Sequence, residues 1–143
     1  DEHNSTNEPD IGDPTVKLVV PDLRPLSNVT DRLKHLDSKI NLKANMAGEL
    51  EFGAATDFAF MTNYWKELQS PAVQGVPAVA RDPSQKAEVV VDCGMLARIF
   101  QCHHLRPSLT VCCIVERGLQ KLLVWHVIIF QNETITYYCP VLD

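Results

Sequence analysis

The chain has 143 residues, of which 45% are hydrophobic and 22% are charged, and this balance fits one globular domain with a sizeable core. The formal net charge is -5, but residues 1–15 hold five of the 18 acidic residues and no Lys or Arg. The rest of the chain is therefore neutral. This excludes strong binding of polyanions through bulk charge, as well as the steering of acidic substrates.

The cysteines and the apolar runs indicate the cellular compartment of the protein. Five cysteines occur at spacings that match no disulfide framework: Cys93, Cys102, Cys112, Cys113 and Cys139. An odd number in a chain with an adequate core indicates free thiols in a reducing compartment, the nucleus or the cytosol. No apolar run approaches the ~18 residues of a membrane span, so no membrane partner is expected.

In chain order, residues 1–15 are polar and are predicted to be a flexible leader or the end of a connector. Residues 16–20 form the first predicted strand. Asp22 can cap a helix whose apolar residues recur every three or four positions from Leu23 to Leu36, which predicts one buried stripe. Three strands follow at residues 39–46, 49–54 and 57–65.

Residues 70–84 are rich in Pro and are predicted to be an exposed loop. The same order of elements then returns. A strand is expected at residues 88–92 and a helix at residues 93–104, which Pro107 ends. Further strands are expected at residues 108–116, 119–130 and 134–141.

The repeated order of elements predicts the fold class. Two βαβββ units predict an α+β fold with antiparallel sheets on the outside and two helices on one face. We expect a single domain at residues 16–143, with unit one at 16–66, a joining loop at 67–85 and unit two at 86–143.

Three stretches carry a resemblance to a known family: KLVVPDLRPLSNVTDRLKHLDSKINLKANMAGELEF, KAEVVVDCGMLARIFQCHHLRP and the terminal TITYYCPVLD. They resemble the DNA sliding clamps of the proliferating-cell-nuclear-antigen-like superfamily, and in particular the C-terminal domain of the Hus-one family of the nine-one-one checkpoint clamp. The resemblance covers residues 16–143. Because a whole clamp subunit has two such domains, it also implies that the N-terminal domain is absent from this chain.

The resemblance implies a non-enzymatic subunit of a heterotrimeric ring that encircles DNA in the DNA-damage checkpoint and repair, in the nucleus. The implied partners are two other clamp-like subunits, double-stranded DNA bound without sequence preference, a clamp loader and repair proteins. Contacts to phosphate position a protein on DNA without reading its sequence. The residues implied to face DNA are Arg24, Arg32, Lys34, Arg98 and Arg106.

The resemblance also implies two protein-binding surfaces. The first is a sheet edge for a neighbouring subunit, since an unpaired apolar edge is otherwise an aggregation liability; its residues are Phe58, Phe60, Met61 and Tyr64. The second is a pocket for short peptide motifs of repair enzymes, formed by Tyr138, Cys139, Pro140 and Val141.

Each of these functional interpretations has a simpler structural alternative. Arginines on an amphipathic helix are usually its solvated face. The cysteines and His103 suggest a metal site, but neighbouring strand residues such as Cys112 and Cys113 point to opposite faces and no CxxC pair is present, so no metal or cofactor is expected. The sequence contains no P-loop, GxSxG, HExxH or dinucleotide-binding glycine motif. The alternatives are a stand-alone interaction module of clamp fold, or an unrecognised metal-binding or enzymatic domain.

Overall fold

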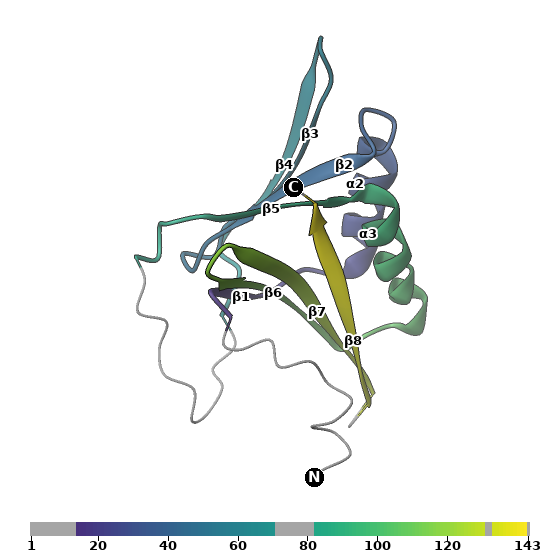
Figure 1. The fold of residues 1–143 in the computed structure, drawn as a ribbon. Helices are drawn as coiled ribbons and strands as arrows, with labels where there is room; N and C mark the ends of the chain where they lie inside the picture. Colours follow the sequence, from purple (N-terminus) through teal and green to yellow (C-terminus); the bar gives the residue numbers. More distant parts are fainter. Residues whose placement is uncertain (1–13, 71–81, 131–132, 143) are drawn as a thin grey trace.

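The computed structural model describes residues 14–70, 82–130 and 133–142, and its elements follow the predicted repeat (Figure 1). The first half contains β1 (Val16–Val19), α2 (Leu23–Leu33), β2 (Lys39–Ala44), β3 (Leu50–Ala55) and β4 (Phe60–Trp65). The second half contains β5 (Ala87–Asp92), α3 (Cys93–Phe100), the 3-10 helix η1 (Gln101–Leu105), β6 (Leu109–Arg117), β7 (Gln120–Phe130) and β8 (Glu133–Leu142). Most of the predicted leader and of the predicted loop between the halves lies outside the described residues.

The two halves share one antiparallel sheet by exchanging their first strands. The strand order is β1-β6-β7-β8-β5-β2-β3-β4. Strand β1 pairs with β6 from the other half, with Val16 opposite Ile114, and β5 pairs with β2, with Lys39 opposite Asp92. The first strand of each half therefore has the same topological role, as a duplicated unit requires.

Both helices cover one face of this curved sheet, where they pack against each other (Figure 1). Each presents a buried apolar stripe to the strands, because residues three or four apart share a helix face. The stripe of α2 contains Leu23, Leu26, Val29 and Leu33, and that of α3 contains Leu96, Ile99 and Phe100. The core thus lies between the helix layer and the sheet.

Aspartates begin both helices, and both helices end earlier than their apolar patterns predict. Asp22 accepts a hydrogen bond from the backbone N–H of Arg24 at 3.3 Å, and Asp92 accepts one from Met95 at 2.9 Å. Such caps satisfy backbone donors that the first turn leaves without partners.

Helix α2 ends at Leu33 rather than Leu36, because the next N–H groups form tighter turn bonds, such as Leu36 to the carbonyl of Leu33 at 2.9 Å. The second predicted helix, 93–104, is α-helical only to Phe100 and continues as η1. Arg106, in the left-handed region (φ 52°, ψ 62°), then turns the chain toward β6.

Candidate functional site

The basic residues of α2 lie on its solvent side. Arg24, Arg32 and Lys34 are exposed, since the opposite side of the helix is buried against the sheet. Lys34 forms an ion pair with Asp31 at 3.8 Å, with both side chains about half exposed at 54% and 53%. Such a surface pair stabilises the fold little, but it offsets part of the local positive charge.

The second half contributes Arg98, exposed in the last turn of α3, and Arg106, exposed just after η1. The structure brings Arg24 and Arg106 to the same pocket. Arg32 lies eight positions further along α2, roughly 12 Å from Arg24 at the helical rise per residue. The predicted basic set is therefore spread along the helix layer, with one convergence at this pocket.

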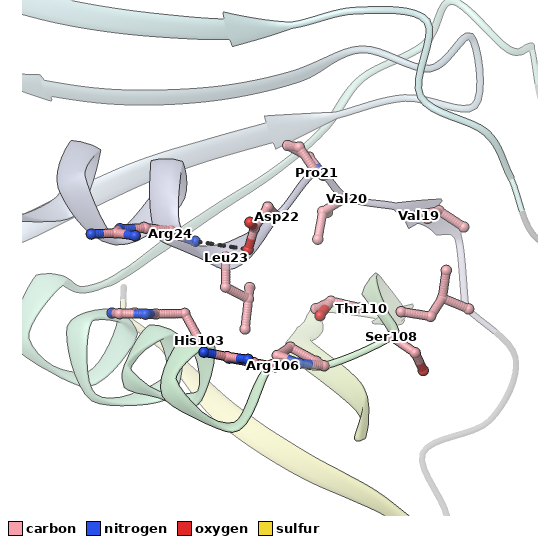
Figure 2. A pocket seen from close by; sticks show the side chains of 12 residues that line it. Val19, Val20, Pro21, Asp22, Leu23, Arg24, His103, Arg106, Ser108 and Thr110 are labelled. Carbon is pink, nitrogen blue, oxygen red and sulfur yellow. Dashed lines mark hydrogen bonds between the residues drawn. The ribbon is translucent and has the colours of Figure 1, made fainter. Parts of the chain in front are cut away.

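This pocket, of about 600 Å³, lies between the start of α2 and the end of η1 (Figure 2). Asp22 and Arg24 line it from the α2 side, and His103 and Arg106 line it from the η1 side. Sequence reasoning missed it, because its two sides come from opposite halves of the chain. The only local signals were Pro21 and Pro107, which mark the two turns that frame it.

Strand β4 is one end of the described sheet and pairs only with β3 there. Because side chains alternate along a strand, Phe60 and Tyr64 share one face, whereas Met61 and Trp65 share the other. Trp65 packs edge-on against Phe52 at 5.1 Å, which places the Met61 face on the helix side. Phe60 and Tyr64 are 81% and 62% exposed.

One predicted residue of this edge is not in the strand. Phe58 lies in the β3–β4 turn, because the Thr56 hydroxyl accepts hydrogen bonds from the N–H groups of Phe58 and Ala59 at 3.2 and 3.1 Å. Its ring is 98% exposed. Figure 1 shows this hairpin projecting from the rest of the fold. Phe58 therefore marks the tip of the hairpin rather than its edge.

The four residues predicted to form a peptide pocket divide between two faces of β8. Cys139 lies opposite Leu123, and both are fully buried in the core. Tyr138 lies opposite Val124 on the other face, Pro140 shares that face, and Val141 packs against the core. Their alternation along the strand prevents all four from lining one pocket, so Cys139 is a core residue and not a peptide contact.

Strand β8 provides a second incompletely paired edge. Its partner β7 covers residues 133–140 on one side. On the other side, β5 pairs only with Val141 and Leu142 at the end of the strand. Within the described residues, β4 and β8 therefore each have a free side over most of their length, and so do β1 at the other end of the sheet and β5 on the side of β8.

Three of the buried thiols have environments that disfavour the thiolate. Burial raises the pKa of Cys113 and of Cys139 to about 11 and raises that of Cys112 well above its usual range. Cys102 lies 2.6 Å from the Tyr137 hydroxyl, and this contact, with some burial, raises the pKa of Tyr137 to about 12. Metal ligation requires a thiolate. Across residues 14–70, 82–130 and 133–142, no group of three or more His, Cys, Asp or Glu side chains is placed to hold a metal ion.

Neither of the α-helices in the described part of the chain is long and apolar enough to cross a membrane.

Comparison with known proteins identifies the family. A profile described as "Hus1-like protein" matches residues 1–143. This chain belongs to the Hus1-like family. The Hus1-like chain is 31% identical over 136 residues to "Checkpoint protein hus1 homolog" of Dictyostelium discoideum, a match that covers 95% of this chain and 47% of that protein. It is 24% identical over 137 residues to human "Checkpoint protein HUS1", covering 95% of this chain and 48% of that one. The Hus1-like chain thus spans about half the length of these curated relatives.

Solved structures confirm the predicted clamp fold. The Hus1-like chain is similar to PCNA from Thermococcus kodakaraensis with a TM-score of 0.61 at 15% identity, over 95% of this chain and 52% of that one. It is also similar to the Helicobacter pylori beta clamp with a TM-score of 0.55 at 14% identity, over 90% of this chain and 30% of that one. The predicted family and the α+β sliding-clamp fold are therefore both confirmed.

Proposed function

We propose that this chain is part of a non-enzymatic subunit of a heterotrimeric ring that encircles double-stranded DNA in the nucleus during the DNA-damage checkpoint and repair. The observation that carries the proposal is a clamp fold of the Hus1-like family with a free strand side at both β4 and β8. A closed ring needs two such edges on each of its domains, because each domain has a neighbouring domain on either side. The same edge in an isolated molecule would promote aggregation.

The helix layer would face the DNA in this ring. Its basic residues are few and are partly balanced by Asp31. A ring that is held on DNA by its closed shape does not require a strong grip on phosphate. Modest attraction in fact favours sliding, since each firm phosphate contact would have to break as the ring moves. A clamp loader and repair proteins are the further partners that this function requires.

Introducing negative charge on the exposed face of Phe60 and Tyr64 is expected to prevent ring assembly. In the complete protein, the double variant Phe60→Glu, Tyr64→Glu should weaken association with the two other clamp-like subunits by on the order of 100-fold, the usual effect of losing buried aromatic anchors. Both side chains are exposed here, so the fold itself should be unaffected. Co-purification and light-scattering mass of the three subunits measure the effect.

Leu119→Glu is the matched control for this pair, because Leu119 is fully exposed in the β6–β7 turn, away from both free strand sides. It should leave the ring intact. Normal ring formation by the Phe60, Tyr64 double variant would show that β4 is not the subunit edge. Failure of the unchanged complete protein to find any clamp-like partner would instead favour a stand-alone interaction module.

Reversal of charge on α2 is expected to reduce the salt dependence of DNA binding. If Arg32 and Lys34 each neutralise one phosphate, the double variant Arg32→Glu, Lys34→Glu should lower the slope of log affinity against log salt by about 2. Lys66→Glu removes an exposed charge just after β4 and should leave the slope unchanged. Duplex binding by the assembled ring at several salt concentrations checks this. An unchanged slope in the double variant would place these side chains away from DNA.

A further inference from the structure

The pocket between α2 and η1 is lined by two short runs of the chain, residues 19–24 and residues 103–110. The first run joins β1 to α2, and the second leads from η1 into β6. At the corresponding corner of the second half, Asp92 both ends β5 and caps α3, so no residues separate strand from helix. The first half thus differs from its repeat by three spacer residues, 20–22, which lie at a pocket of about 600 Å³.

One end of this pocket is basic. Figure 2 shows Arg24 of the first run beside His103 of the second, with Arg106 further along that second run. Neither guanidinium forms an ion pair within the part of the chain that the structure describes. Asp22 is the acidic residue of the lining, and one of its oxygens accepts the N–H of Arg24 at 3.3 Å. The lining therefore carries two permanent cations against one carboxylate.

The other part of the lining is apolar. Figure 2 shows Val20 and Leu23 pointing from the first run toward the second, and Val19 at the opposite end from Arg24. Leu109 also lines the pocket, and it is 38% exposed. An aliphatic side chain left open to water inside a pocket favours a ligand that has an apolar group of its own. The pocket is thus divided between cationic and aliphatic side chains.

We propose that this pocket binds a short peptide segment of a partner protein in which an Asp or Glu stands next to an aliphatic residue. The carboxylate pairs with Arg24 and Arg106, because a guanidinium presents paired N–H donors that match the two oxygens of a carboxylate. The aliphatic side chain packs against Val19 and Leu109 and removes them from water. The volume lies in the range of pockets that hold ligands, about 300–1,000 Å³.

Duplex DNA fits the basic end of the pocket but not the aliphatic part. Proteins hold the DNA backbone through its phosphate and sugar oxygens, which would leave Val19 and Leu109 uncovered. An acidic and aliphatic peptide satisfies both parts of the lining at once. The proposal goes beyond the ring function, since both sides of the pocket belong to one chain and no second subunit is needed to form it.

Variants that preserve the fold test the two parts of the lining. Arg106→Gly removes a guanidinium at a left-handed position, φ 52°, which glycine occupies without strain. Leu109→Thr shortens an exposed side chain at the start of β6 and keeps a β-branched residue that suits a strand. The matched controls are Lys66→Ala and Leu119→Thr, since each alters an exposed side chain that does not line the pocket.

The probe is a phage library of random heptapeptides. Peptides that bind elsewhere are first removed on the complete protein with Arg106→Gly and Leu109→Thr combined, and the remainder are selected on the complete parent. The recovered peptides should carry an acid beside an aliphatic residue. Synthetic copies, followed by fluorescence anisotropy, should bind each single pocket variant roughly tenfold more weakly than the parent, the scale of losing one anchoring contact. The two control variants should bind them as the parent does.

Recovery of no peptide, or of peptides without an acid beside an aliphatic residue, would overturn the proposal. So would recovered peptides whose binding is unchanged in both single pocket variants. A short DNA duplex is measured with the same proteins. If Arg106→Gly weakens duplex binding and no peptide is recovered, the pocket is a DNA contact and the peptide proposal is wrong.

Discussion

Replacing Trp125 with alanine is expected to lower the free energy of unfolding by about 3–5 kcal/mol, the usual range for deleting a large buried aromatic side chain. Trp125 is fully buried. It meets Phe100 edge to face at 5.1 Å, and Phe100 in turn stacks on Phe52 at 6.1 Å. These rings connect β7, α3 and β3, so the cavity would open where both halves of the fold meet. Equilibrium urea unfolding followed by circular dichroism measures the loss.

Trp125→Phe is the matched comparison for this prediction. It retains an aromatic ring against Phe100 and removes an indole N–H that is buried without a hydrogen-bond partner in the described structure. Both effects should make its loss clearly smaller than that of the alanine variant. Equal losses in the two variants would show that the packing of the ring is not what Trp125 contributes.

Gly48→Ala is expected to have the second-largest effect, about 2–5 kcal/mol, because it combines backbone strain with a steric clash. Gly48 has φ +91°, and an added Cβ would lie 2.6 Å from the carbonyl oxygen and 2.9 Å from the amide nitrogen of Leu68. Leu68 cannot easily retreat, since its N–H donates to the Gly48 carbonyl at 3.0 Å. The same urea experiment measures the loss of stability.

Gly118 separates the two contributions to that loss. It also has a left-handed φ, +61°, but an added Cβ would meet nothing within 4 Å. Gly118→Ala should therefore cost only the backbone strain, about 1–2 kcal/mol. A Gly48→Ala variant no less stable than Gly118→Ala would mean that the approach of Leu68 relaxes freely.

The turn around Gly48 also shows why a hairpin can be predicted from a short stretch of sequence. The fully buried Asn45 side chain accepts the N–H groups of Ala47 and Glu49 at 3.0 and 3.1 Å and donates to the Glu49 carboxylate at 2.7 Å. These bonds are local in sequence, and the alternating strands on either side fix the rest. The predicted hairpin between residues 39 and 54 needed no knowledge of distant residues.

Helix stripes were equally predictable, because the period of 3.6 residues specifies the buried face. The ends of the elements were not. Phe58 continues the apolar pattern of β4, yet the Thr56 hydroxyl draws it into a turn. Helix α3 gives way to η1 at Gln101, and the left-handed Arg106 ends η1 and redirects the chain toward β6. Competing local hydrogen bonds and a single unusual backbone angle are not visible in an apolar pattern.

Sites made from both halves were the least predictable part. Arg24 and Arg106 had been grouped only because the family is basic at such positions, and nothing in the spacing placed them at one pocket. Tyr138 and Cys139 were grouped by position in the chain, whereas strand alternation separates them.

The exchange of first strands between the halves has a consequence for synthesis on the ribosome. Strand β1 leaves the exit tunnel early, but the strand that it pairs with, β6, is made only after the whole first half and α3. Until then, Val16 and Leu18, both buried in the finished fold, have no sheet to join. Nascent chains stalled before β6 should therefore be sensitive to protease and dependent on chaperones, and folding should be slow because its decisive contacts are distant in sequence.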